Sequence, residues 1–189
     1  DEMYGRQSGT LVVPGPIADR WEGAFRPGHF EGVLTVVAKL FHLVEPDLAV
    51  FGRKDLQQSL VIRQMVSDLD FDIEIIVAAT VREADGLALS SRNSYLAPHQ
   101  RQQALAISRS LLAARRLWRQ GQHDSGVLSA TIGEVLGAES GVVPEYIAVV
   151  DPDRLEPVET ALPGTILAIA ARVGSTRLID NTILGDEEF

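Results

Sequence analysis

The chain has 189 residues, of which 46% are hydrophobic, 23% charged and 6% aromatic, a composition of the globular rather than the disordered or fibrous class. It holds no cysteine, which excludes disulfides, thiolate zinc sites and a cysteine nucleophile, and its formal net charge of −9 argues against nucleic-acid or acidic-lipid partners. Because neither a bilayer-spanning apolar stretch nor a secretory leader is visible, we expect no membrane partner and a cytoplasmic protein.

The first half of the sequence predicts a parallel α/β sheet. Residues 10–13 are a short strand candidate, and apolar residues at helical spacing predict a helix that begins near Phe30 or Val33 and ends before Pro46. Residues 48–52 are continuously apolar, as in a strand buried on both faces; a second helix follows Asp55, and residues 73–77 form the next strand. Loops after such strands usually carry function, here residues 52–55 and 78–93.

The sequence pattern changes from Pro98 onward. An arginine-rich amphipathic helix is expected to about Gln120, and another over residues 124–136. Residues 144–150, 165–173 and 176–184 read as antiparallel strands, with a tight turn at Gly174-Ser175. We therefore predict an α/β domain over residues 1–94 and a smaller α+β domain over residues 95–189.

Gly52-Arg53-Lys54-Asp55 is the first candidate site, because it follows a strand and opens a helix. Backbone amides, a cation and a helix N-terminus would meet there, and phosphate suits such a place. The lysine would bind a phosphate as a point charge, and the Asp55 carboxylate could accept from sugar hydroxyls. About equally well, Asp55 is only a helix cap and Lys54 a solvated side chain. Gln57 and Gln58 follow, and either amide could contact a polar organic substrate.

A second candidate is the loop over residues 86–93, where two hydroxyls and a guanidinium stand in the consecutive positions Ser90, Ser91 and Arg92. Hydroxyls and a forked cation suit polyphosphate oxygens, although a plain helix-entry loop is the alternative. His29 lies near a helix start, where it could donate to phosphate or move a proton, but a lone histidine is more often structural. The motifs of phosphate-loop ATPases, serine hydrolases and built-in zinc sites are absent, so we expect no protein-held metal.

Three ordered motifs carry a family resemblance: Arg26–Val33, Phe51–Gln58 and Val81–Asn93. Together they resemble pantothenate synthetases (pantoate/β-alanine ligases), and the resemblance continues to Arg172–Asn181. It implies a Rossmann-like parallel sheet of the nucleotidyl-transferase (HIGH) type. Compared with that fold, the chain covers the second half of the nucleotide-binding domain and the whole C-terminal α+β domain.

The resemblance implies an ATP-dependent ligase that forms a carbon–nitrogen bond. ATP and pantoate would give pantoyl adenylate and pyrophosphate, and β-alanine would then displace AMP to give pantothenate, the vitamin B5 precursor of coenzyme A. Mg²⁺ is expected on the ATP phosphates rather than in a protein cage. The intact protein is expected to be a homodimer. The implied roles are ATP binding by Gly52, Arg53, Lys54, Asp55, Val81, Leu89, Ser90, Ser91 and Arg92, pantoate binding by Gln58, and catalysis by Lys54, Ser90, Ser91 and Arg92. His29 is added as a catalytic candidate because of its place near a helix start.

The sequence departs from the family pattern in two ways. Arg53 stands where the family usually has Glu, and Leu56 where it has an aromatic residue, so we expect a changed nucleotide affinity rather than a changed reaction. The family's His-x-Gly-His signature is absent, and we expect roughly a hundred further residues before Asp1 in the intact protein. The 189-residue chain alone is then expected to be inactive. Another adenylyl- or nucleotidyl-transferring relative and a non-catalytic fragment are the alternatives.

Overall fold

The structure is a computed structural model that describes Met3 and residues 9–187. It divides into two compact units. The first consists of Asp1–Val50 and Gln57–Ile76, and the second of Phe51–Leu56 and Val77–Phe189. The predicted division at residue 94 remains a prediction; by compactness, residues 77–94 cluster with the later part of the chain.

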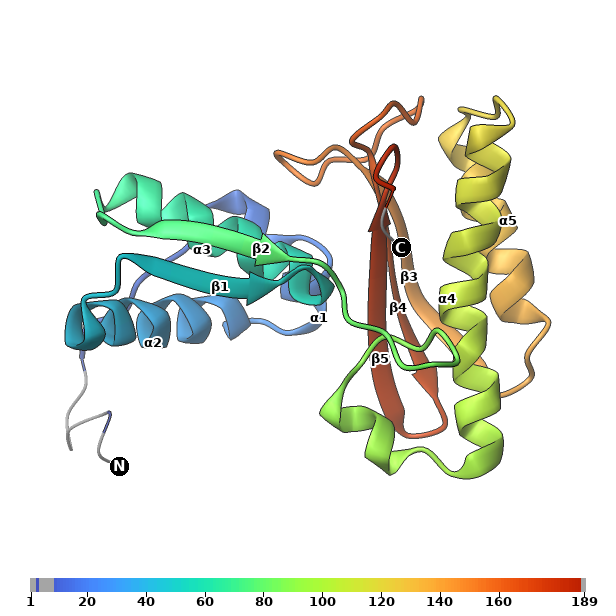
Figure 1. Cartoon of the computed structure of the whole chain (residues 1–189), viewed down its shortest axis with the longest axis horizontal. Helices are drawn as coiled ribbons and strands as arrows, with labels where there is room; N and C mark the ends of the chain where they lie inside the picture. The colour runs from blue at the N-terminus through green and yellow to red at the C-terminus, as the bar shows by residue number, and fades with distance from the viewer. Residues whose placement is uncertain (1–2, 4–8, 188–189) are drawn as a thin grey trace. The chain divides into compact units, whose positions relative to one another are not determined.

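The first half forms the predicted alternation of helices and strands. Two short helical turns, η1 (Pro16–Asp19) and α1 (Glu22–Phe25), precede α2 (His29–Val44), β1 (Leu48–Gly52), α3 (Leu56–Asp68) and β2 (Glu74–Ala78). The two strands pair with each other, and their arrows point the same way in Figure 1. The predicted parallel α/β arrangement is therefore confirmed.

Helix α2 begins and ends for local reasons. Gly28 precedes it with a φ of 75°, which glycine adopts without steric cost, and Glu45 follows it in the left-handed conformation before Pro46. One face is buried along its length, made of Phe30, Leu34, Val37, Ala38 and Phe41. These residues have helical spacing, as predicted, but the apolar Leu40 and Val44, which the sequence predicts on the same face, are 40% and 67% exposed.

Two expectations about this half are wrong. Residues 10–13 form no strand; Val12 instead donates its N–H to the hydroxyl of Thr35 at 2.9 Å. Strands β1 and β2 are not buried on both faces, because their residues alternate between exposed and half-buried. A parallel strand is buried only where neighbouring strands and two helix layers surround it. Within the described residues, this sheet contains only β1 and β2.

The second half builds an antiparallel sheet in the predicted order. Strands β3 (Val142–Val150), β4 (Ile166–Val173) and β5 (Thr176–Ile183) pair in sequence, and Gly174, with a φ of 59°, makes the turn between the last two. Helices α4 (Pro98–Arg119) and α5 (Ser125–Gly137) pack on this sheet (Figure 1). The core between them is fully buried and aliphatic, and includes Ile107, Leu111, Leu128, Ile132, Leu167 and Ile169. Burial of so many aliphatic side chains is the main stabilisation of this unit.

Candidate active site

The first candidate segment, Gly52–Asp55, is held by its backbone. Residues Arg53–Asp55 form a 3-10 turn, η2, directly before α3. The side-chain amide of Asn181 on β5 donates to the carbonyl of Arg53 at 2.9 Å and to that of Lys54 at 3.0 Å. Asn181 is only 5% exposed, so these bonds are shielded from water.

Gly52 has open space on the side where other residues carry Cβ. An added Cβ would meet nothing within 4 Å, and the φ of −81° is one that any residue adopts. The protein's own packing therefore does not require glycine at this position. Close approach of a ligand to the backbone is a reason for glycine here.

The second candidate segment, Val81–Arg92, folds back on itself as a narrow loop. Leu89 donates its N–H to the carbonyl of Val81 at 2.8 Å, Arg82 and Ala88 form an isolated antiparallel bridge, and Gly86 makes the turn with a φ of 92°. The side chains of Val81 and Leu89 remain 65% and 55% exposed. Two apolar side chains thus stand in solvent at the base of the loop, next to backbone groups that already bond to each other.

Strand β5 anchors this loop through a buried ion pair. The guanidinium of Arg82 binds both carboxylate oxygens of Asp180, at 2.7 and 3.1 Å, and also donates to the carbonyl of Gly86 at 3.2 Å. Asp180 is 3% exposed, and burial raises the pKa of its carboxyl, while the charges of Arg82 and, more weakly, Lys54 act in the opposite direction. Asp180 is adjacent to Asn181 in the middle of β5, so one stretch of this strand holds both candidate segments.

A second set of polar contacts stiffens the loop from inside. Arg101 on α4 bridges the carboxylates of Glu83 at 2.8 Å and Asp85 at 2.6 Å, and the amide of Asn93 donates to Glu83 at 2.6 Å. The bonds from Arg101 and then Asn93 lower the pKa of Glu83. In Asp85, partial burial opposes the change, but the Leu87 amide and Arg101 still lower the pKa. Both acids therefore stay ionised near neutral pH and keep Arg101 engaged.

The hydroxyl and guanidinium groups lie at the start of the 3-10 turn η3 (Ser91–Tyr95). The Ser90 hydroxyl accepts from the backbone N–H of Arg92 at 3.2 Å and caps the turn. Ser91 and Arg92 are exposed, and the Arg92 guanidinium donates over a long distance, 3.5 Å, to the carbonyl of Arg177. The guanidinium is thus held weakly enough to exchange this partner for an anion.

The Arg53 side chain already has a partner outside the candidate segments. Its guanidinium forms an ion pair with Asp186, and the Arg53 side chain is 14% exposed. Asp186 also accepts, through its backbone carbonyl, from the buried guanidinium of Arg115. Burial first and neighbouring arginines next lower the pKa of Arg115. The positive charge at position 53 is therefore neutralised within its own unit.

The remaining predicted residues lie in the first unit. His29 is half-buried at the start of α2 and accepts from the Arg26 guanidinium, 2.9 Å away. Gln58 is half-buried on α3. Its neighbour Gln57 is a structural residue: its amide donates to two carbonyls of residues 17–20 at 2.8 Å and accepts from the N–H of Glu22 at 3.0 Å. The substrate-contact alternative for Gln57 is therefore disfavoured, whereas Gln58 stays available.

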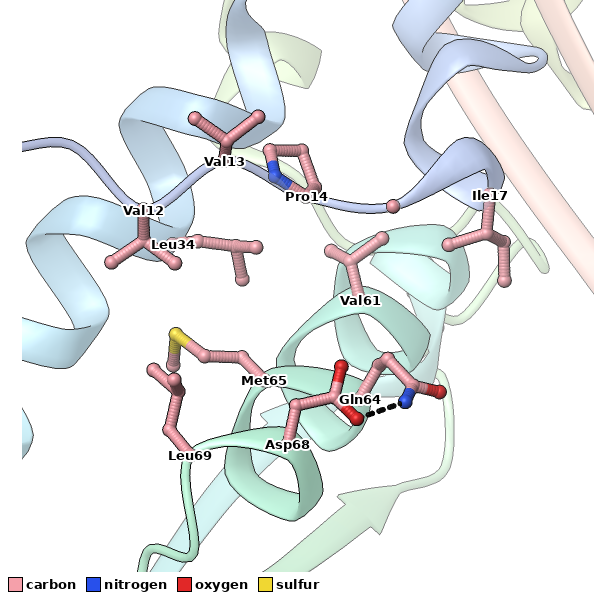
Figure 2. Close-up of a pocket in the computed structure, with 11 residues that line it drawn as sticks. Val12, Val13, Pro14, Ile17, Leu34, Val61, Gln64, Met65, Asp68 and Leu69 are labelled. Carbon is pink, nitrogen blue, oxygen red and sulfur yellow. Dashed lines mark hydrogen bonds between the residues drawn. The ribbon is translucent and has the colours of Figure 1, made fainter.

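The first unit also contains a small pocket, shown in Figure 2, which none of the predicted site residues lines. Apolar side chains surround it, among them Val12, Leu34, Val61 and Met65, while Gln64 and Asp68 bond to each other at 2.6 Å on one side.

Among the described residues, no three acidic, histidine or cysteine side chains gather as a metal site would need. No helix in the described part of the chain combines the length and apolarity that crossing a bilayer requires.

Sequence reasoning missed three residues that position the candidate segments: Arg82, Asp180 and Asn181. A signal was present in the predicted strand over residues 176–184, where Asp180, Asn181 and Thr182 are three consecutive polar residues. At least one of them faces a buried side whatever the register, and a buried polar group needs a partner. The partners themselves lie 98 to 128 positions away in the sequence, beyond any local pattern.

Comparison with known proteins relates the chain to one protein family. The family model described as pantoate-beta-alanine ligase matches residues 1–183. The pantothenate synthetase of Agrobacterium fabrum is 49% identical over 188 residues, covering 99% of this chain and 64% of that protein. The one from Koribacter versatilis is 46% identical over 184 residues, covering 97% and 63%. The chain thus spans slightly less than two thirds of these relatives.

Solved structures agree with this placement. A crystal structure of pantothenate synthetase from Thermus thermophilus superposes with a TM-score of 0.93 at 47% identity, covering 96% of this chain and 66% of that one. A pantoate-beta-alanine ligase from Francisella tularensis, crystallised with beta-gamma ATP and beta-alanine, gives a TM-score of 0.67 at 32% identity, covering 92% and 58%.

Proposed function

The chain belongs to the pantoate-beta-alanine ligase family, and on that premise we propose that the protein joins pantoate and β-alanine at the expense of ATP. The resemblance predicted from the three sequence motifs is thereby confirmed at the level of the family. The observation that carries the proposal is the anchoring of both phosphate-binding candidates, residues 52–55 and 81–92, to the neighbouring residues Asp180 and Asn181.

The proposed reaction has two steps. A pantoate carboxylate oxygen attacks the α-phosphorus of ATP, the bond to the bridging oxygen breaks, and pyrophosphate leaves. The amine of β-alanine then attacks the carbonyl carbon of pantoyl adenylate, loses a proton, and AMP leaves with the electrons of the broken carbon–oxygen bond. Both leaving groups are phosphates, so fixed cations at their oxygens lower both barriers.

The two anchored segments supply groups for such a site. Lys54 would bind the phosphates as a point charge, Arg92 would bind them through its fork, and the hydroxyls of Ser90 and Ser91 would add donors without charge. The exposed base of the loop, at Val81 and Leu89, suits an adenine ring, with the Val81 backbone as its polar contact. Asp55, which is exposed, would accept from the ribose.

Gln58 and His29 complete the proposed assignment. The Gln58 amide offers both a donor and an acceptor, which match the hydroxyl and carboxylate groups of pantoate. His29 would donate to a phosphate when protonated or carry a proton when neutral. Arg53 would serve ATP through its backbone rather than its side chain, because the guanidinium already pairs with Asp186.

Mg²⁺, dimerisation and a cytoplasmic location also belong to the proposal. Mg²⁺ would be held by the ATP phosphates rather than by protein carboxylates, and it would supply positive charge to balance the leaving pyrophosphate. A homodimer is expected by family resemblance and is measured by sedimentation equilibrium. A cytoplasmic location follows from the need for ATP and is measured by cell fractionation.

The test is AMP release that depends on both pantoate and β-alanine, measured on the complete gene product and on the 189-residue chain. We expect the complete product to turn over only when pantoate is present, and the shorter chain to be inactive. AMP release with another acid but not with pantoate would favour a different nucleotidyl-transferring activity. Absence of ATP binding by calorimetry in both proteins would favour a non-catalytic role and overturn the proposal.

A further inference from the structure

We propose that Asn181 is a positioning residue for Lys54, and that it acts by fixing the backbone of the 3-10 turn from which the lysine projects. This inference rests on the proposed function, since it assumes that Lys54 contacts ATP phosphates. It adds a residue from the C-terminal strand β5 that touches no substrate itself.

The hydrogen bonds of Asn181 are directed at the backbone of residues 53 and 54. One nitrogen, Nδ2, donates to two successive carbonyls at 2.9 and 3.0 Å, and Asn181 has only two amide hydrogens to give. Those carbonyls belong to the first turn before α3. Two fixed carbonyls define the orientation of the peptide planes on either side of the Cα atom of Lys54, and hence the direction in which its side chain leaves the backbone.

The Lys54 side chain itself is left without such fixation. Within the described residues, its ammonium group makes no hydrogen bond or ion pair, although the charge of Lys54 acts on the nearby Asp180 carboxyl. Asp180 in turn is occupied by both nitrogens of Arg82. The backbone is therefore pinned while the charged end stays available, which is the arrangement a preorganised phosphate ligand requires.

The position of Asn181 also links the two candidate segments. Its backbone N–H donates to Asp180 Oδ1 at 2.8 Å, so the residue that orients Lys54 also helps to orient the carboxylate that holds Arg82 and the loop beyond it. The remaining amide oxygen, Oδ1, is buried with no hydrogen-bond partner among the described residues. A buried polar atom without a hydrogen-bond partner lowers the stability of the fold. The unpaired Oδ1 atom therefore indicates that Asn181 does more than stabilise the fold.

The experiment is a double-mutant cycle on ATP binding, measured by calorimetry with the complete gene product. We expect Asn181→Ala to weaken binding about tenfold, as misplacement of one cationic ligand would do. Lys54→Ala should weaken it by at least as much, and the double variant should bind no more weakly than Lys54→Ala alone. Thr176→Val is the matched control, because this buried residue lies at the other end of β5, and its ATP affinity should equal that of the wild type.

The outcomes separate this proposal from the proposed function. Wild-type protein that fails to bind ATP overturns both. If the wild-type protein binds ATP, two results overturn only the positioning role. One is an ATP affinity of Asn181→Ala equal to that of the wild type, and the other is a double variant whose loss of affinity is the product of the two single losses. If Asn181→Ala does not fold, Asn181→Ser, which keeps one donor, takes its place in the cycle with the same criteria. Faster amide hydrogen exchange at residues 53–56 in the variant is the expected structural signature, and unchanged exchange would also contradict the proposal.

Discussion

Replacing Asp180 with asparagine tests whether the buried ion pair holds the loop to β5. The Asp180 and Arg82 side chains are 2% and 10% exposed, and the carboxylate binds two guanidinium nitrogens. Asn keeps the volume but removes the charge, which leaves a buried guanidinium that still donates to the neutral Gly86 carbonyl. Removing one partner of a buried pair costs about 3 kcal/mol or slightly more. In urea, with a slope of about 2 kcal/mol per molar, the unfolding midpoint should fall by about 1.5 M.

The two tryptophans allow the second unit to be measured separately. Trp21 lies in the first unit and Trp118 in the second, where its indole donates to the carbonyl of Ala161 at 2.8 Å. In a Trp21→Phe background, fluorescence then reports urea unfolding of the second unit. Glu139→Gln is the matched control, because its partner Arg109 is 3.6 Å away and 55% exposed, and exposed pairs contribute about 0.5 kcal/mol. If Asp180→Asn costs no more than this control, the ion pair does not hold the loop.

The other predictions concern three more contacts. Gln57→Leu should destabilise the first unit by about 2 kcal/mol, since three backbone bonds are lost, measured by Trp21 fluorescence in urea; an effect below about 0.5 kcal/mol would contradict it. Because the pKa of Glu83 is lowered from its ordinary value of 4.5, the ion pair with Arg101 stabilises the fold above pH 4.5, and this stability is lost as the pH falls from there through the lowered pKa. Glu83→Gln should therefore reduce the loss of unfolding free energy at acid pH, measured by urea titrations at several pH values. Arg53→Glu should cost about 1 kcal/mol by facing Asp186, and Arg53→Glu with Asp186→Arg should recover most of it; additive losses would refute the pairing.

The order and type of the elements were predictable because each is set by local pattern. Helix α2 and the strands β4 and β5 begin and end within a residue or two of the predicted positions. Helical spacing of apolar residues, a turn at Gly174 and a proline after a helix each act over a few residues, so the sequence reveals them directly. The two segments that carry the candidate site were predicted for the same reason.

Burial and long-range pairing were not predictable in this way. Residues 48–52 look like a fully buried strand, yet β1 alternates between exposed and half-buried residues, because burial depends on neighbours that the pattern does not show. The partner of Arg82 lies 98 positions away, at Asp180, among many carboxylates of the chain. A charged residue in a loop gives no local sign of which distant residue it pairs with, and only the fold selects it.

The reversed charge at position 53 shows how a side chain can change while the segment keeps its proposed role. The family resemblance implies a glutamate there, and an exposed arginine beside the proposed nucleotide site would alter the field on the phosphates. In this chain the Arg53 guanidinium pairs with Asp186, whereas its carbonyl accepts from Asn181. The side chain and the backbone of Arg53 thus bind different partners. Because the proposed ATP contacts at residues 52–55 use the backbone, Lys54 and the Asp55 carboxylate, an arginine at position 53 is compatible with them as long as a compensating charge such as Asp186 is present.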